Sequence, residues 1–467
     1  MVQGELSPYA PFRQGGKEER VAACGRPDLA SGRLGYGTSM TVQVRLSYGD
    51  DGLDIAVPDD AVVVYPQDAP AVPDSAAALT RALREPVSGA PLRERIHRGQ
   101  TVAISVCDGT RPQPRQLMIP AVLSELDGIV DSSDIVILIA TGTHRANTDA
   151  ELRAMLGDEV VDTVRIVNHD SRDQASLSWA GRFGNDVPVW LNTEWLQADV
   201  RITTGFVEPH FFAGFSGGPK MVAPGLAGLD TVLVLHDAAR IGHPLATWGI
   251  TVGNPIHDDV RAIAAAMGVT FALDVVLDRR KQIVAAFGGD ILPMHAAAVR
   301  LARQLAMRPL PAPFDIVVTT GSGYPLDQNL YQSVKGMSAA SRIIADGGMI
   351  ICAAECRDGY PDHGSYRDVL RSAPSPQHLL DDIAGRTVTI PDQWQVQIQA
   401  QIQTRARVVM HTSYLSDAEL ADAHLTQTCD IGETIDAELR RLGSGARICV
   451  LPEGPQTIPY VDSAGLA

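Results

Sequence analysis

The chain has few of the features that mark membrane, secreted or disulfide-stabilised proteins. Aromatic residues make up 5% of its 467 residues, and its six cysteines lie far apart except for Cys352 and Cys356. Scattered cysteines do not form a disulfide scaffold, and one close pair without a second argues against a zinc ribbon. No apolar run reaches the roughly 20 residues that cross a bilayer, and the N-terminus shows no apolar signal segment. We therefore expect a cytoplasmic protein with no membrane partner.

Positive charge is also scarce. Lys and Arg total 39 against 55 Asp and Glu, which gives a net charge of −16. Such a chain lacks the overall field that attracts phosphate backbones, so nucleic acid is not expected as the main partner, although a local basic pocket remains compatible. With 45% hydrophobic and 20% charged residues, the composition is that of a globular protein of about two to four domains.

What is present is an alternation of apolar strands and helical stretches. Strand-like runs occur at residues 101–106, 135–140, 164–167 and 200–204, helical stretches occur at 112–126 and 149–156, and further strands follow at 314–320, 348–353 and 448–451. This order predicts an α/β fold with mainly parallel sheets. A Pro-rich break near 305–313 divides it into two α/β domains, 40–305 and 306–467, and we expect the active site in the cleft between them. Residues 1–39 show neither a helical nor a strand periodicity of apolar residues and are predicted to be a flexible N-terminal extension.

Two strand ends carry polar residues. The first strand runs into Asp108, Thr110 and Arg111, and the second runs into a small-residue turn that ends at His144. Free N–H groups at a helix start bind anions, and an arginine adds a bidentate donor for phosphate or carboxylate. A histidine at a loop tip is suited to general base catalysis. An ordinary N-capped turn and a surface histidine are the alternatives.

The richest segment is residues 205–225, with six glycines and three prolines. It is neither a helix interior nor a central strand, and it lacks the Lys-Ser/Thr ending of a nucleotide-binding P-loop. Gly217 and Gly218 precede Lys220, an arrangement that can cradle a phosphorylated ligand or present a nucleophilic amine. His210 lies in the same segment and is a candidate acid or base. A purely structural glycine-rich loop is the alternative.

Two further groups complete the candidate set. His236 ends an apolar run and, as a metal ligand, suits nickel, copper or zinc, although a buried structural histidine is the alternative. In the second domain, Tyr331, Gln332 and Lys335 are spaced to share one side of a helix. They are placed to present donors to a carboxylate across the cleft, or they form an ordinary polar helix face.

Taken together and in this order, these motifs resemble the nickel-dependent lactate racemase family of 2-hydroxyacid racemases and epimerases. The resemblance spans roughly residues 40–460. It rests on the separations of His144 and Lys220 by 76 residues, of His210 and Lys220 by 10, and of Lys220 and His236 by 16.

The resemblance implies a cofactor and a role for each residue. The cofactor would be a nickel-pincer nucleotide, a pyridinium mononucleotide whose sulfur-bearing arms hold nickel, covalently attached at Lys220. His236 would fill the remaining nickel position, and His144 and His210 would act as acid/base residues on opposite faces of the substrate. Further implied contacts are to substrate or cofactor anions by Arg111, Gln332 and Lys335, and to the cofactor by Asp108, Thr110, Gly217, Gly218, Tyr331 and Trp394.

The chemistry of racemisation agrees with this set. A racemase acts on both faces of one carbon and therefore needs a base on each side. The C–H bond of a 2-hydroxyacid is poorly acidic, whereas removal of hydride leaves a stable 2-oxoacid whose other face can accept the hydride again. The predicted activity is thus racemisation or epimerisation of lactate or a related 2-hydroxyacid, with maturation dependent on cofactor-synthesis enzymes.

The chain also departs from the family pattern. Pro219 stands before Lys220, where a basic residue is common in the family, so one possible anion contact is absent and the loop is expected to hold the cofactor phosphate differently. Two other functions remain open from the residues alone: a relative that binds an organic anion or nucleotide without turnover, and a zinc-dependent hydrolase or lyase that uses His144, His210 and His236.

Overall fold

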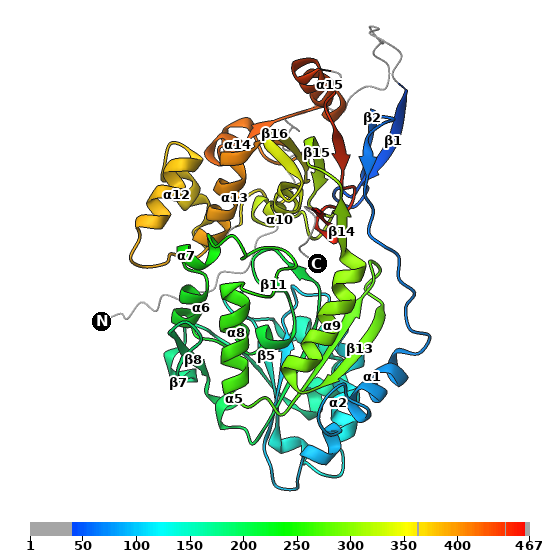
Figure 1. Ribbon diagram of the computed structural model, residues 1–467. Coiled ribbons are helices and arrows are strands. Elements are labelled where there is room, and N and C mark those ends of the chain that lie inside the picture. Colours follow the sequence, from blue (N-terminus) through cyan, green and yellow to red (C-terminus); the bar gives the residue numbers. More distant parts are fainter. Residues whose placement is uncertain (1–39, 362–363, 444, 463–467) are drawn as a thin grey trace, which may run out of the picture.

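The computed structural model describes residues 40–361, 364–443 and 445–462. These residues form two α/β units that lie one above the other (Figure 1). The first unit is built from residues 75–306, and the second from residues 307–462 together with residues 41–64. Residues 1–39, where a flexible extension is predicted, lie outside the described part of the chain.

The first unit is built on a six-stranded sheet of order β13-β12-β9-β4-β5-β6, in which only β13 runs antiparallel to its neighbour. The strands are β4 (Val102–Cys107), β5 (Ile135–Ala140), β6 (Arg165–Asn168), β9 (Val200–Phe206), β12 (Phe271–Leu277) and β13 (Ile283–Gly289). Helices cover both faces, so a central strand such as β4 is buried along its whole length. This explains why the predicted strands are continuous apolar runs.

Helices and two small hairpins complete the first unit. Helices α1 (Ser75–Arg84), α2 (Arg115–Leu126), α3 (Asp149–Leu156) and α4 (Asp158–Thr163) cover one face. The other face is covered by α5 (Thr193–Gln197), α6 (Leu229–Leu235), α8 (Pro255–Ala266), α9 (Ile291–Ala306) and the hairpin β7 (Leu177–Phe183) with β8 (Val187–Asn192). Helix α7 (Ala238–Ile241) and the hairpin β10 (Pro209–His210) with β11 (Gly214–Phe215) lie toward the second unit.

The second unit has a parallel six-stranded sheet of order β18-β17-β16-β15-β19-β3. Its strands are β3 (Val62–Val63), β15 (Phe314–Thr320), β16 (Ile344–Ala353), β17 (Arg407–His411), β18 (Thr426–Gln427) and β19 (Ile448–Val450). Its helices are α10 (Leu330–Ser341), α11 (Tyr366–Arg371), α12 (Pro376–Gly385), α13 (Gln393–Arg405), α14 (Asp417–Asp422) and α15 (Ile431–Leu442). No helix in the described ranges is both long and apolar enough to cross a membrane.

The N-terminal strands pack with the second unit, although the sequence analysis assigned them to the first. Strand β3 pairs with β19, and the hairpin of β1 (Thr41–Leu46) and β2 (Leu53–Pro58) packs its apolar side against Ile316 and Val318. Periodicity shows that such a hairpin has one apolar face, but it does not show which sheet covers that face. The Pro-rich break also contains a strand, β14 (Met307–Leu310), which pairs with β20 (Ile458–Val461).

The units share a continuous apolar contact. Phe211, Phe212 and Trp248 of the first unit pack in one cluster with residues of α10 and α13 in the second. The indole N–H of Trp248 donates a hydrogen bond to the hydroxyl of Ser338 at 3.0 Å. The glycine-rich segment that contains Phe211 and Phe212 therefore lies at the boundary between the units, as the sequence predicts for an active site in that cleft.

Candidate active site

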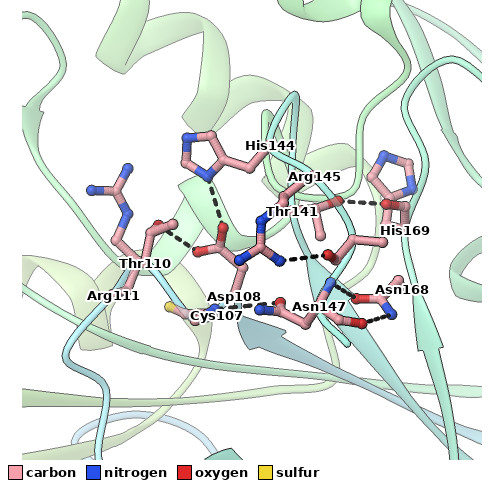
Figure 2. Close-up of polar contacts among 12 residues, drawn as sticks. Cys107, Asp108, Thr110, Arg111, Thr141, His144, Arg145, Asn147, Asn168 and His169 are labelled. Atoms are coloured by element: carbon pink, nitrogen blue, oxygen red, sulfur yellow. Dashed lines mark hydrogen bonds and ion pairs between the residues drawn. The ribbon is translucent and has the colours of Figure 1, made fainter. Parts of the chain in front are cut away.

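Asp108 and His144 meet at the carboxyl ends of two neighbouring strands. In the parallel pair β4 and β5, Cys107 lies opposite Ala140, so the residues that follow share one edge of the sheet. Oδ2 of Asp108 lies 2.7 Å from Nδ1 of His144, and Oδ1 accepts a hydrogen bond from the Thr110 hydroxyl at 2.8 Å (Figure 2). A carboxylate at Nδ1 favours the neutral tautomer with its proton there, which leaves a lone pair on Nε2.

The environment of Asp108 keeps its carboxylate ionised. Only 3% of the residue is exposed, and burial alone would raise its pKa. The hydrogen bond and charge of His144, together with the charge of Arg111, outweigh burial and lower the pKa of Asp108. An ionised carboxylate stabilises the imidazolium that forms when His144 takes a proton. The His144 side chain is 41% exposed and therefore accessible to a ligand.

Arg115 holds the loop that contains Asp108 and Arg111. Its buried guanidinium donates hydrogen bonds to the carbonyls of Cys107 at 2.8 Å, Arg111 at 2.8 Å and Gln113 at 3.2 Å, and also to that of Asp108. These bonds hold the loop of residues 107–113 in place. Helix α2 begins at Arg115, three residues after the predicted start at residue 112. Sequence reasoning missed this role because a basic residue in a first helical turn ordinarily faces solvent.

His210 is half-buried in the hairpin of the glycine-rich segment. The backbone N–H groups of Ala213 and Phe212 approach its Nδ1 at 3.3 and 3.5 Å, which favours a neutral ring with the proton on Nε2. Burial, and then the nearby charges of Lys220 and Arg111, lower its pKa well below the ordinary value. His210 is therefore neutral at physiological pH.

Lys220 lies on the short 3-10 helix η4 (Gly218–Met221) that ends the glycine-rich segment. Burial and the charge of Arg111 lower the pKa of its amine to about 7. A large fraction of the amine is then unprotonated at neutral pH, which is the form that attacks an electrophile.

His236 closes the C-terminus of α6 and is 7% exposed. Its Nδ1–H donates a hydrogen bond to the carbonyl of Val232 at 2.7 Å, so Nε2 carries the lone pair. Burial and the charge of Lys220 lower its pKa to about 4. Metal-ligating histidines commonly donate one ring N–H to a backbone carbonyl and bind the metal through the lone pair of the other ring nitrogen. His236 has this arrangement.

The ring of Phe212 lies between three of the predicted residues. Its centroid is 4.4 Å from the His210 ring, 5.1 Å from the His236 ring and 5.4 Å from Nζ of Lys220. These side chains come from separate elements and form one cluster around an apolar centre. Sequence reasoning did not single out Phe212, because an aromatic between glycines is equally consistent with simple core packing.

The second unit supplies its predicted residues to the same cluster. Trp394 contacts His236 in a tilted arrangement with ring centroids 4.8 Å apart, and its indole N–H donates to the Tyr331 hydroxyl at 3.2 Å. Lys335 donates to Oε1 of Gln332 at 2.8 Å. Burial and the charge of Arg111 lower the pKa of Lys335 to about 8, against an opposing effect of Glu208. The two units therefore build one site.

Arg111 links the two halves of the site electrostatically. Its charge lowers the pKa values of His210, Lys220 and Lys335 and also acts on Asp108. The guanidinium makes no ion pair with a carboxylate among the described residues. A guanidinium that forms no ion pair and lies near other cations favours an anionic ligand.

Gly217 and Gly218 are required by packing beneath the loop. Both have positive φ, 72° and 47°. A Cβ on Gly217 would lie 2.7 Å from a carboxylate oxygen of Asp274, and one on Gly218 would lie 2.6 Å from the ring of His295. The N–H of Gly218 donates to Asp274 at 2.6 Å, and the His295 ring bonds the carbonyl of Ser216 at 2.8 Å. Asp274 was missed, although a lone aspartate in the apolar strand 271–277 is a visible signal.

The side chains of the described residues do not by themselves provide a complete set of metal ligands. No group of three or more His, Cys, Asp and Glu side chains among them is arranged to hold a metal ion. The zinc hydrolase alternative requires His144, His210 and His236 to converge as ligands, so it has no support in the structure. A metal bound by His236 would need its other ligands from outside the protein.

Fold and site together define a two-unit α/β protein with three histidines, a lysine of lowered pKa and an arginine without an ion pair to any described residue gathered at the unit boundary. Comparisons with known proteins agree. The lactate racemase N-terminal domain family matches residues 48–249, and the lactate racemase C-terminal domain family matches residues 311–458. The lactate racemase of Thermoanaerobacterium thermosaccharolyticum is 36% identical over 81% of this chain and 89% of its own, and that of Lactiplantibacillus plantarum is 35% identical over 80% and 89%.

Solved structures give the same result. The lactate racemase apoprotein from Thermoanaerobacterium thermosaccharolyticum superposes with a TM-score of 0.84 at 33% identity, covering 90% of this chain and all of that one. A crystal structure of a Thermotoga maritima protein, at 18% identity and a TM-score of 0.63, shares the fold. The chain belongs to the lactate racemase family, and it is an isomerase of the racemase type.

Proposed function

We propose that this racemase interconverts the stereoisomers of a 2-hydroxyacid, lactate or a related acid, with a nickel-pincer nucleotide attached at Lys220 as its cofactor. The observation that supports this most directly is the arrangement of His210, Lys220 and His236 around the Phe212 ring, within 5.4 Å of its centre. An acid/base group, an attachment point and a metal ligand are thereby gathered at one place.

The residues present fit this cofactor. His236 offers one free nitrogen, and the absence of a group of three protein ligands in the described ranges suits a metal whose other ligands belong to an organic molecule. Lys220 has the depressed pKa that covalent attachment requires. Trp394, whose ring centroid lies 4.8 Å from that of His236, offers an aromatic surface beside the proposed metal ligand. When bound, the nucleotide supplies a reversible hydride acceptor.

His144 is the better prepared of the two proposed bases. Its Nε2 accepts the proton of the substrate hydroxyl, and the Asp108 carboxylate stabilises the resulting imidazolium. His210 has no carboxylate partner in its described contacts, and its Nδ1 accepts hydrogen bonds from two backbone N–H groups, which places the ring proton on Nε2. The two faces of the substrate therefore meet chemically different histidines, and proton transfer at His210 needs a change in its protonation.

Attachment at Lys220 changes the electrostatics of its neighbours. The positive charge of Lys220 lowers the pKa values of His210 and His236 in the free protein. An amide-type bond at Nζ would remove that charge and so raise the pKa of His210, although burial, the largest cause of its lowering, would remain. His210 then becomes a more effective base in the mature enzyme than in the free protein.

Arg111, Lys335 and Gln332 form the proposed anion-binding group. Arg111 and Lys335 carry positive charge near each other, and Gln332 orients the Lys335 amine through a 2.8 Å hydrogen bond. A substrate carboxylate between them would relieve the repulsion between these cations. The carboxylate would thereby be held while the planar oxoacid turns its other face.

The test uses protein coproduced with the cofactor-synthesis enzymes, which we propose as its maturation partners. Intact mass and nickel content are measured first, followed by racemisation of L-lactate and D-lactate. We expect an adduct of several hundred daltons on the Lys220 peptide and near one nickel per chain. His210→Ala should retain both and lose racemisation.

Two results would overturn the proposal. Absence of adduct and nickel, with the synthesis enzymes shown to work on a control racemase, would indicate a protein that binds another anion. Full nickel and adduct with racemisation unchanged in both His144→Ala and His210→Ala would refute the two-base assignment.

A further inference from the structure

A cavity of about 450 Å³ lies between the units beside Arg111. Its first-unit wall is formed by residues 109–112 and by the turn between β12 and β13, which contributes Arg279 and Lys281. The second-unit wall includes Ser322 and Glu453. This volume is within the range of small-molecule sites, and polar groups line it from both units.

The cavity has an excess of positive charge. Glu453 is paired with Arg279, whose guanidinium lies 2.6 Å from its carboxylate. That pairing leaves Arg111 and Lys281, neither of which forms an ion pair with any described residue. Arg111 and Lys281 also act on the nearby carboxylate of Glu208, but the residues that line the cavity comprise three cations and one anion. They favour an anionic occupant.

Lysine usage in the chain supports a role for Lys281. Only four lysines occur in the sequence, and the three in the described ranges are Lys220, Lys281 and Lys335. Two of these belong to the proposed active site, and the third lines the cavity next to it. Elsewhere the chain uses arginine for positive charge.

The turn that carries Lys281 has a defined shape. Oδ1 of Asp278 accepts hydrogen bonds from the backbone N–H groups of Arg280 and Gln282, both at 2.8 Å, and Lys281 itself has φ of 65°. Lys281 lines the cavity, whereas its neighbour Arg280 does not. The same turn therefore offers a cation at the cavity and a matched cation away from it.

The cavity adjoins the proposed reaction site. Arg111 lines the cavity and also acts electrostatically on His210, Lys220 and Lys335. The charge of Lys281 acts on Glu208, two residues before His210. A ligand held at Arg111 thus shares its cavity with a second cation, Lys281, which is distinct from Lys335.

We infer that Lys281, with Arg111, forms a second anion subsite, and that the substrate is a 2-hydroxyacid with an additional acidic group. This rests on the proposed function, because it assigns a substrate class to that same site. A hydroxydicarboxylate such as 2-hydroxysuccinate (malate) has this chemistry, whereas lactate would leave the second cation unpaired. The phosphate of a bound nucleotide shares the chemistry and is separated by the experiment.

The experiment compares kcat/KM for malate and lactate in holoenzyme of the wild type, Lys281→Met and Arg280→Met, each with its adduct quantified by mass. We expect the malate-to-lactate ratio to fall at least tenfold in Lys281→Met and to stay within twofold in Arg280→Met. Thermal unfolding of the apo proteins with malate, lactate or inorganic phosphate gives a readout independent of turnover. Malate should raise the unfolding temperature of the wild type and Arg280→Met more than that of Lys281→Met.

The failures are distinguishable. No racemisation of either acid by fully loaded wild type would refute the proposed function. Lactate turnover with an unchanged ratio in Lys281→Met would overturn the second subsite alone. A reduced cofactor load in Lys281→Met, with an unchanged ratio and stabilisation of the apo wild type by phosphate but not malate, would assign the subsite to a nucleotide phosphate and overturn the substrate class.

Discussion

Nδ1 of His144 lies 2.7 Å from Oδ2 of Asp108, a buried carboxylate whose pKa is lowered by that contact. This pairing joins the ends of two adjacent strands and prepares one of the two histidines, but not the other, for proton transfer. His210 has backbone N–H groups at its Nδ1 instead. The site is therefore asymmetric, although the reaction it supports is symmetric with respect to the reacting carbon.

Replacing Asp108 should disable His144. Asp108→Asn removes the charge that stabilises the imidazolium, and we expect the racemisation rate to fall by about 100-fold or more. Thr110→Val removes only the 2.8 Å hydrogen bond to the other carboxylate oxygen and should cost less than about tenfold. Initial rates in both directions, on enzyme with matched cofactor load, measure both effects. A rate within threefold of the wild type in Asp108→Asn would contradict the role given to this pair.

His236 should control metal retention independently of attachment. In His236→Ala the Lys220 adduct should remain visible by intact mass, while nickel content falls at least tenfold. His243→Ala changes an exposed histidine close to His236 in the sequence, so it is the control and should keep its nickel. Equal nickel in the wild type and His236→Ala would show that His236 is not the metal ligand.

The Lys220 amine should react at lower pH than an ordinary lysine. Because its pKa is about 7, the unprotonated form dominates above that pH and disappears below it. Labelling of apo protein with an amine-reactive reagent across pH, followed by peptide mass analysis, should give half-maximal modification of Lys220 near pH 7. The Lys335 peptide is the internal comparison, with its midpoint near pH 8. A Lys220 midpoint near the ordinary lysine value of about 10 would contradict the depressed pKa.

Asp274 should make the stability of the protein depend on pH. Burial raises its pKa to about 7, so between about pH 4 and 7 the folded state holds a proton that the unfolded chain has lost. The free energy of unfolding therefore falls as pH rises through this window, by at most about 1.4 kcal/mol per pH unit from this group. Asp274→Asn cannot titrate and should remove that contribution.

Urea unfolding of the wild type, Asp274→Asn and Asp131→Asn at several pH values measures this difference. Asp131 is exposed and provides a matched control that should follow the wild type. The buried histidines His236 and His295 have lowered pKa values, so the protein loses stability as pH falls through their titration. All three proteins contain both histidines, so this contribution cancels in the comparison. Parallel pH profiles for the wild type and Asp274→Asn would show that Asp274 is ionised in the folded protein.

The sequence by itself determined the parts of this protein that depend on local physics. Apolar runs of strand length became the strands of both sheets, because buried parallel strands need apolar side chains on both faces. Parallel strands place their carboxyl ends on one edge, so Asp108 and His144 were each expected at the edge where ligands bind, whereas their contact is seen only in the structure. Motif order and spacing also identified the family.

Only the tertiary structure decided which surfaces meet. The hairpin of residues 41–58 covers the second sheet, and Phe212, Arg115 and Asp274 act through contacts with residues distant in the sequence. Periodicity records that a side chain is buried but not what it is buried against. For the same reason the sequence predicts the glycine pair before Lys220 as a ligand cradle, and only the structure shows that the missing side chains also leave room for Asp274 and a histidine ring.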